Sequence, residues 1–117
     1  YVADTWNMRI QVFVPGTDGR MSPQPAATWE VPGWELSTGD NNKPYLAVAP
    51  GGQVYFTVPG RNYVAATDGA GKVLLVWSGM DAGRVAMSIP VGIAVDDLGR
   101  VYVSDSGNGR ILVFGVP

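Results

Sequence analysis

The segment YVSDSGNGRILVF, residues 102–114, places an aromatic residue, an apolar strand, an Asp, an Asn and an Arg in a fixed order. Residues 1–13, YVADTWNMRIQVF, follow the same order, and residues 55–67, YFTVPGRNYVAAT, follow its apolar pattern. Three related segments in a chain of 117 residues indicate an internal repeat with a period of about 50 residues. The fold is therefore expected to consist of repeated units.

The sequence divides one full unit into four short strands. Alternating apolar residues predict strands A to D, named from the inside of the unit outward, at residues 45–49, 54–58, 63–67 and 73–77. Gly and Asp occur in the turns at residues 50–52 and 68–71, where they tolerate the positive φ of tight hairpins. One unit is thus expected to be a four-stranded antiparallel sheet.

The first and last units are incomplete. The first contains strands B, C and D at residues 1–3, 9–13 and 27–31, and the last contains A, B and C at residues 91–95, 101–104 and 110–114. Repeated four-stranded sheets with this period are typical of a β-propeller, in which each sheet is one blade. We predict an all-β fold, a partial β-propeller of about three blades, with blade segments at residues 1–33, 44–79 and 90–115.

Three blades are too few to close a ring, because closed propellers contain about four to eight. Blades cover their apolar faces by packing on neighbouring blades, so a short stretch leaves both end faces exposed. The chain is therefore expected to be part of a longer protein or to complete a ring as a homo-oligomer. A dimer with three blades per copy is the favoured ring.

The amino-acid composition excludes several classes of function. Hydrophobic residues make up 46% of the chain and charged residues 15%, which favours a folded domain over disorder. The net charge is −2 and the basic residues are dispersed, so no nucleic-acid partner is expected, and no apolar run is long enough to insert into a membrane. The chain contains neither Cys nor His, which removes thiolate chemistry and the commonest metal ligand and general base. We expect no cofactor, no metal and no catalytic residue.

The repeated segments resemble a known family. Residues 1–10 and 102–111 are similar to the NHL repeat, which runs roughly aromatic-Val-x-Asp-x-x-Asn-x-Arg-Ile, and residues 90–96, PVGIAVD, resemble its inner strand. The middle unit departs from the pattern, with Val58 in place of Asp and Tyr63 in place of Arg. The resemblance implies a propeller of usually six blades that serves mostly as an interaction platform. It also implies a bacterial context, extracytoplasmic or attached to a membrane protein as a C-terminal appendage.

Two sets of polar residues recur at the same spacing. Asp4 and Arg9 in the first unit correspond to Asp105 and Arg110 in the last. A carboxylate at the end of strand B can pair with an Arg at the start of C, which fixes the hairpin between them. We therefore interpret these four residues as structural.

The loops between B and C and between D and A share one face of a propeller, and loops on a rigid scaffold commonly carry binding residues. Aromatic side chains beside Arg and Asn suit a sugar or a peptide. The candidate ligand-binding residues on this face are Trp6, Asn7, Trp34, Arg61, Asn62, Arg84 and Asn108. Trp29 and Trp77, at matching places in the outer strands, are expected to pack between blades.

The favoured function is a non-catalytic binding scaffold for a protein, peptide or glycan. The alternative is a propeller enzyme, a calcium-dependent lactonase or hydrolase or a lyase, whose site is completed by other blades. The acidic residues offer little for such a site, since Asp96 and Asp97 are expected in a β-turn and Asp40 in a solvated loop.

Overall fold

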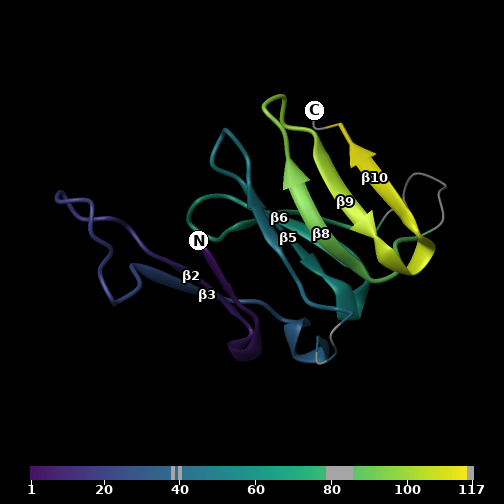
Figure 1. Ribbon diagram of the computed structural model, residues 1–117, viewed down its shortest axis with the longest axis horizontal. Coiled ribbons are helices and arrows are strands. Elements are labelled where there is room, and N and C mark those ends of the chain that lie inside the picture. The colour runs from purple at the N-terminus through teal and green to yellow at the C-terminus, as the bar shows by residue number, and fades with distance from the viewer. Residues whose placement is uncertain (38, 40, 79–85, 116–117) are drawn as a thin grey trace.

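The computed structural model describes residues 1–37, 39, 41–78 and 86–115, which form three antiparallel sheets (Figure 1). The first sheet contains β1 (Val2–Asp4), β2 (Arg9–Val12) and β3 (Ala27–Glu30), in that order. A long loop joins β2 to β3 and extends away from the sheets, closed at its base by a bridge between Pro15 and Met21.

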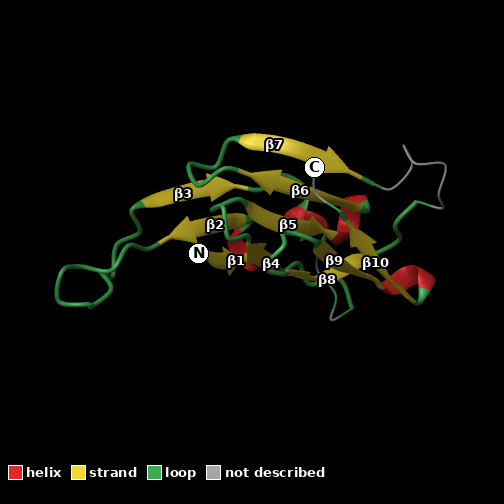
Figure 2. Cartoon of the chain, turned by 90° about the horizontal axis from the view of Figure 1, so that it is seen from above, coloured by secondary structure: helices red, strands yellow, loops and turns green. Residues whose placement is uncertain are grey.

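The second sheet has four strands and the third has three. In the second the order is β4 (Leu46–Val48), β5 (Val54–Val58), β6 (Tyr63–Thr67) and β7 (Val73–Trp77). In the third the order is β8 (Pro90–Val95), β9 (Val101–Asp105) and β10 (Arg110–Phe114). Each strand pairs with the one that precedes it in its sheet, so β4 and β7 are the inner and outer edges of the second sheet (Figure 2).

The architecture confirms the predicted fold class. The described residues contain ten strands, arranged as sheets of three, four and three, as expected of a partial propeller. Several strand ends differ from prediction by one residue, and two of these shifts reach an acidic residue: β1 covers residues 2–4 instead of 1–3, and β9 reaches Asp105. Both shifts have one cause, because Asp4 pairs with Arg9 and Asp105 with Arg110 in the strand register, which extends each hairpin to the acidic residue.

Two apolar clusters hold the three sheets together. Between the first and second sheets, Ile10 packs with Phe56 and Val58, and between the second and third sheets, Val64 packs with Val103. Successive residues of β5 and β6 alternate between the two clusters, as side chains of a strand alternate between its faces. β5 and β6 are therefore buried on both faces, in the way the inner strands of a propeller blade are, whereas most residues of β7 are exposed.

Equivalent positions in the repeat offer a matched test of this packing. Ile10 is 0% exposed and Ile111, at the same repeat position, is 70% exposed. We expect Ile10→Ala to lower the free energy of unfolding by about 2–5 kcal/mol because it leaves a cavity between sheets, and Ile111→Ala to change it by less than about 0.5 kcal/mol. Urea denaturation of both variants measures this, and equal losses would contradict the blade assignment.

Candidate functional site

The loop face is built from four short 3₁₀ turns among the described residues. Three of them, η1 (Thr5–Asn7), η3 (Pro59–Arg61) and η5 (Ser106–Asn108), join strands B and C of their sheets, and η2 (Trp34–Leu36) follows β3. Figure 1 shows these turns along the lower edge of the molecule, at one end of the sheets. The sequence therefore gathers loops from all three sheets on one face.

The three B–C turns end in the same way. Each closes on a left-handed residue, Met8 (φ 57°), Asn62 (φ 57°) or Gly109 (φ 62°), whose N–H donates to the first carbonyl of the turn. Gly adopts this conformation freely and Asn adopts it more readily than most residues, whereas an unbranched Met pays a steric cost. A shared backbone geometry therefore persists although the residues differ.

In the first sheet an ion pair joins the two strands that flank η1. Arg9 Nε donates to Asp4 Oδ2 at 2.7 Å, and Asn7 Nδ2 donates to Asp4 Oδ1 at 3.0 Å. These hydrogen bonds, that from Arg9 foremost, hold the pKa of Asp4 below its ordinary value. The carboxylate is therefore ionised at neutral pH, and its oxygens already accept hydrogen bonds from Asn7 and Arg9 of the same hairpin.

The last sheet repeats this arrangement in a more buried form. Arg110 Nε donates to Asp105 Oδ2 at 2.7 Å, Asn108 Nδ2 donates to the same oxygen at 2.9 Å, and the Ser88 N–H donates to Oδ1 at 2.6 Å. Burial acts to raise the pKa of Asp105, but the hydrogen bonds from Asn108, Ser88 and Arg110 outweigh it and the pKa is lowered. Both predicted Asp–Arg pairs are thus present, and the Asp105 pair also ties η5 to the chain before β8.

Two predicted ligand-binding Asn side chains bind neighbouring backbone. Asn62 Oδ1 accepts a hydrogen bond from the Ile89 N–H at 2.9 Å, and Asn108 Nδ2 donates to the Ala86 carbonyl at 3.0 Å. Both bonds join a B–C turn to the segment that leads into β8. These amides therefore position loops, and Arg84, another candidate, lies outside the described residues.

Trp34 lies in η2 on the loop face, but its side chain is buried and is not the exposed aromatic ring that the candidate site called for. Its indole is buried between the first two sheets, donates from Nε1 to the Thr57 carbonyl at 2.9 Å, and meets the Phe56 ring edge-on. Gly33, at φ 101°, turns the chain inward at this point, and a Cβ there would come within 2.6 Å of Val58. The buried carbonyl at the end of β5 thus obtains a donor from the indole.

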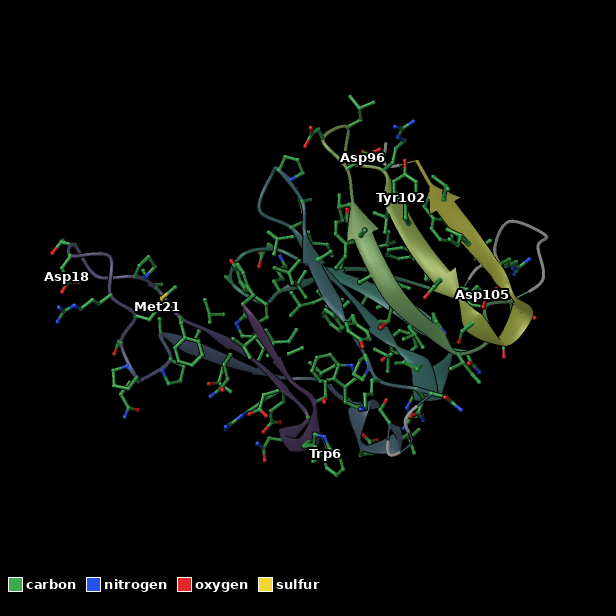
Figure 3. All side chains as sticks on the ribbon, in the orientation of Figure 1. Trp6, Asp18, Met21, Asp96, Tyr102 and Asp105 are labelled. Carbon is green, nitrogen blue, oxygen red and sulfur yellow. The ribbon has the colours of Figure 1, made fainter. Side chains whose placement is uncertain are left out.

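Trp6 is the aromatic side chain that the loop face presents to solvent. It is 85% exposed and points away from the sheets (Figure 3), with exposed Met8 and Leu36 on the same face. Two hollows of about 210 Å³ and 170 Å³ lie beside these residues, and Met8 and Glu35 line both. Trp6 and Trp34 line the smaller hollow together with Thr5 and Ser37.

Glu35 is a residue of this face that the sequence analysis did not identify. Its Oε2 accepts a hydrogen bond from the Gly33 N–H at 2.7 Å, and Oε1 lies 3.7 Å from Arg61 Nη2. Backbone hydrogen bonds from Glu35 and Gly33, with a smaller contribution from Arg61, lower the pKa of the Glu35 carboxyl. The sequence does contain one indication of this role. Glu35 follows the Pro32-Gly33 pair by two residues, and the N–H groups at the start of such a turn are free to bind a carboxylate.

Asp96 lies at the opposite end of the third sheet and forms the predicted β-turn. Oδ1 accepts from the N–H groups of Leu98 and Arg100, and Oδ2 accepts from Arg100 Nε and the Tyr102 hydroxyl. Burial opposes the ionised form of this carboxylate, yet these bonds lower its pKa to about 2. Asp40, the other acidic position considered for a metal, lies outside the described residues.

Comparison with known proteins identifies one repeat. The family model for the NHL repeat matches residues 87–114, which cover β8, β9, η5 and β10. No curated protein matches the chain. In the described part of the chain, no helix is long and apolar enough to cross a membrane.

The Asp105 cluster generates a prediction about stability. Asp105→Ala leaves Arg110, Asn108 and the Ser88 N–H without their shared acceptor, so we expect a loss of about 1–3 kcal/mol in the free energy of unfolding. Asp97→Ala, which removes an exposed carboxylate from the same sheet, is the control and is expected to be near neutral. Thermal or urea unfolding measures the stability of both variants. Equal stability would overturn the structural interpretation of Asp105.

Proposed function

From the NHL repeat at residues 87–114, we propose that the chain is a non-catalytic interaction scaffold that binds a protein, peptide or glycan through its loop face. The observation that carries this proposal is the exposed indole of Trp6. An aromatic ring combines a large contact area with few rotatable bonds, so a ligand that covers it gains free energy at little entropic cost.

The support beneath Trp6 strengthens the proposal. Its turn, η1, lies between two strands that the Asp4–Arg9 ion pair joins, and the neighbouring η2 is fixed by the buried Trp34. A binding residue in a rigid turn loses little conformational freedom when a ligand binds. The loop face is thus suited to recognition without rearrangement.

The chemistry beside Trp6 indicates the kind of ligand. Glu35 supplies a negatively charged acceptor between the two hollows, and Met8 supplies an apolar wall. A sugar ring with hydroxyl donors or a peptide with a basic side chain matches this pairing, whereas a nucleic-acid phosphate would be repelled.

The carboxylates of Asp4, Asp96 and Asp105 are each bound to donors of their own sheet, which favours binding over catalysis.

Self-association belongs to the same proposal. Val2 is 48% exposed, whereas Phe56 and Val103, at the same repeat position in the later sheets, are 6% and 0% exposed because each packs on the preceding sheet. The first sheet thus presents a blade face that lacks a neighbour among the described residues. A second copy is the proposed cover, and two copies of three blades would close a ring of six.

Trp6→Ala tests the loop face. We expect the variant to lose about 2 kcal/mol or more of binding free energy, roughly 30-fold in Kd, toward ligands that wild-type protein captures from glycan and peptide arrays. Its unfolding midpoint should not change, since the side chain is exposed. Met21→Ala, in the loop remote from this face (Figure 3), is the control; unaltered affinity in Trp6→Ala would refute the assignment.

Light scattering tests self-association. The 12.4 kDa chain is expected to form a dimer or a larger closed ring, and Val2→Asp is expected to shift it toward the monomer, because the variant places a charge on the blade face that we propose to be covered. A cooperatively unfolding wild-type monomer at every concentration would contradict this part of the proposal.

A further inference from the structure

The larger of the two hollows on the loop face, about 210 Å³ in volume, combines apolar walls with side-chain acceptors. Three apolar residues and three residues with side-chain oxygens line it: Met8, Val31, Pro32, Asn7, Glu30 and Glu35. Among these lining residues there is no Lys or Arg. The hollow therefore offers an incoming side chain an apolar surface with hydrogen-bond acceptors beside it.

Glu30, at the end of β3, is the acceptor that has no partner within the described part of the chain. It lies opposite Arg9 in the strand register, where opposite charges commonly pair. Arg9 instead donates through Nε to Asp4, its register partner on the other side, at 2.7 Å. No hydrogen bond or ion pair joins Glu30 to another described residue. The exposed carboxylate of Glu30 is therefore free to bind an added cation.

The repeat does not account for the charge of Glu30. Trp29 and Trp77 occupy the same place in the strand pairings of their sheets, so the residues that follow them, Glu30 and Ser78, correspond to each other. The second sheet thus forms without a charged residue at this position. A carboxylate that the blade does not require and that no described residue neutralises is suited to contact with a ligand.

The other two acceptors of the hollow are only partly used. Asn7 donates through Nδ2 to Asp4, and its carbonyl oxygen Oδ1 accepts no hydrogen bond from the described residues. Glu35 Oε1 lies 3.7 Å from Arg61 Nη2, which is too far for a hydrogen bond, and both side chains are about half exposed. The hollow and its ion-paired neighbours thus hold three carboxylates against two guanidinium groups: Asp4, Glu30 and Glu35 against Arg9 and Arg61. The surplus charge is negative.

We propose that this hollow binds a basic side chain of a peptide, with arginine preferred to lysine; this inference rests on the proposed function of the loop face. The guanidinium lies between Glu30 and Glu35, and its methylene stem lies against Met8. An apolar residue of the same peptide covers Trp6 in the adjoining hollow, which shares Met8 and Glu35 with this one. A planar guanidinium has five donors and can bond to several acceptors at once, whereas an ammonium group has three.

The chemistry of the hollow selects this occupant. A sugar hydroxyl can donate to the same acceptors, but it carries no charge to balance Glu30. A metal ion needs several oxygen ligands close together, and among the described residues no group of three or more acidic side chains is placed to hold one. A basic side chain supplies both the charge and the donors.

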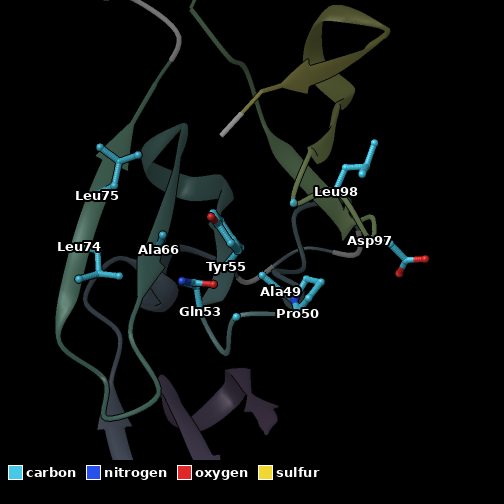
Figure 4. Close-up of a pocket in the computed structure, with 11 residues that line it drawn as sticks. Ala49, Pro50, Gln53, Tyr55, Ala66, Leu74, Leu75, Asp97 and Leu98 are labelled. Atoms are coloured by element: carbon cyan, nitrogen blue, oxygen red, sulfur yellow. The ribbon is translucent and has the colours of Figure 1, made fainter. Parts of the chain in front are cut away.

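A second groove, of about 510 Å³ between the second and third sheets, does not share this chemistry (Figure 4). Its lining is mostly apolar, and Asp97, the one carboxylate among its lining residues, points away from it. The recognition of a cation is therefore assigned to the loop face.

NMR titration with synthetic peptides tests the proposal. The probes are acetylated peptides in which Leu and Arg are separated by none, one, two or three Gly, each with a counterpart that carries citrulline in place of Arg. Citrulline keeps the shape of the side chain and removes its charge. We expect at least one spacing to bind, and its arginine form to bind about tenfold more tightly than its citrulline form. Absence of binding by every peptide, or equal affinity of the two forms, would overturn the proposal.

Two variants separate this inference from the proposed function. Glu30→Gln should reduce the affinity for the arginine peptide to about that for the citrulline peptide, with an unchanged unfolding midpoint because Glu30 is exposed. Trp6→Ala should weaken binding of both peptides. Asp97→Asn, which removes an exposed carboxylate at the opposite end of the sheets, is the control and should alter neither affinity.

The outcomes distinguish the two proposals. A peptide or glycan whose binding needs Trp6 but is unaffected by Glu30→Gln would refute the basic-side-chain site and leave the loop face as a binding surface. Binding that neither substitution weakens would refute both.

Discussion

The sheets of this chain carry apolar side chains on both faces, and each face requires a neighbouring sheet. In the second sheet Phe56 and Val58 face backward to Ile10, while Tyr55 and Val64 face forward to the third sheet. Period-two alternation along β5 and β6 thus produces two interfaces from one sheet. The side-by-side arrangement of the three sheets follows from this packing.

The repeat made most of the fold predictable. Alternation and turn residues located all ten described strands to within one or two residues, and the matched spacing of Asp4 with Arg9 and of Asp105 with Arg110 predicted both ion pairs. These features depend on neighbours in the same hairpin, which the sequence places next to each other. The NHL repeat was recognisable in residues 102–111 for the same reason.

The loop face was less predictable because its contacts cross between sheets. Trp34 and Trp6 are both loop aromatics in the sequence, yet one is buried by the inward turn at Gly33 and the Thr57 carbonyl, and the other is not. Glu35 was missed, since its partners are backbone donors that only the folded turn brings together. The middle blade shows that the Asp–Arg pair within a hairpin can also be replaced: Val58 is fully buried where the other blades have Asp, so apolar packing serves there in place of an ion pair.

Among the described residues the two apolar clusters have no member in common, and both include residues of the second sheet. In the language of polymer statistics the chain is a one-dimensional array of three elements with two nearest-neighbour couplings. A packing defect beside Ile10 reaches the third sheet only by loosening the second. Each end sheet can therefore unfold without the other. Whether the three sheets unfold together depends on the middle sheet.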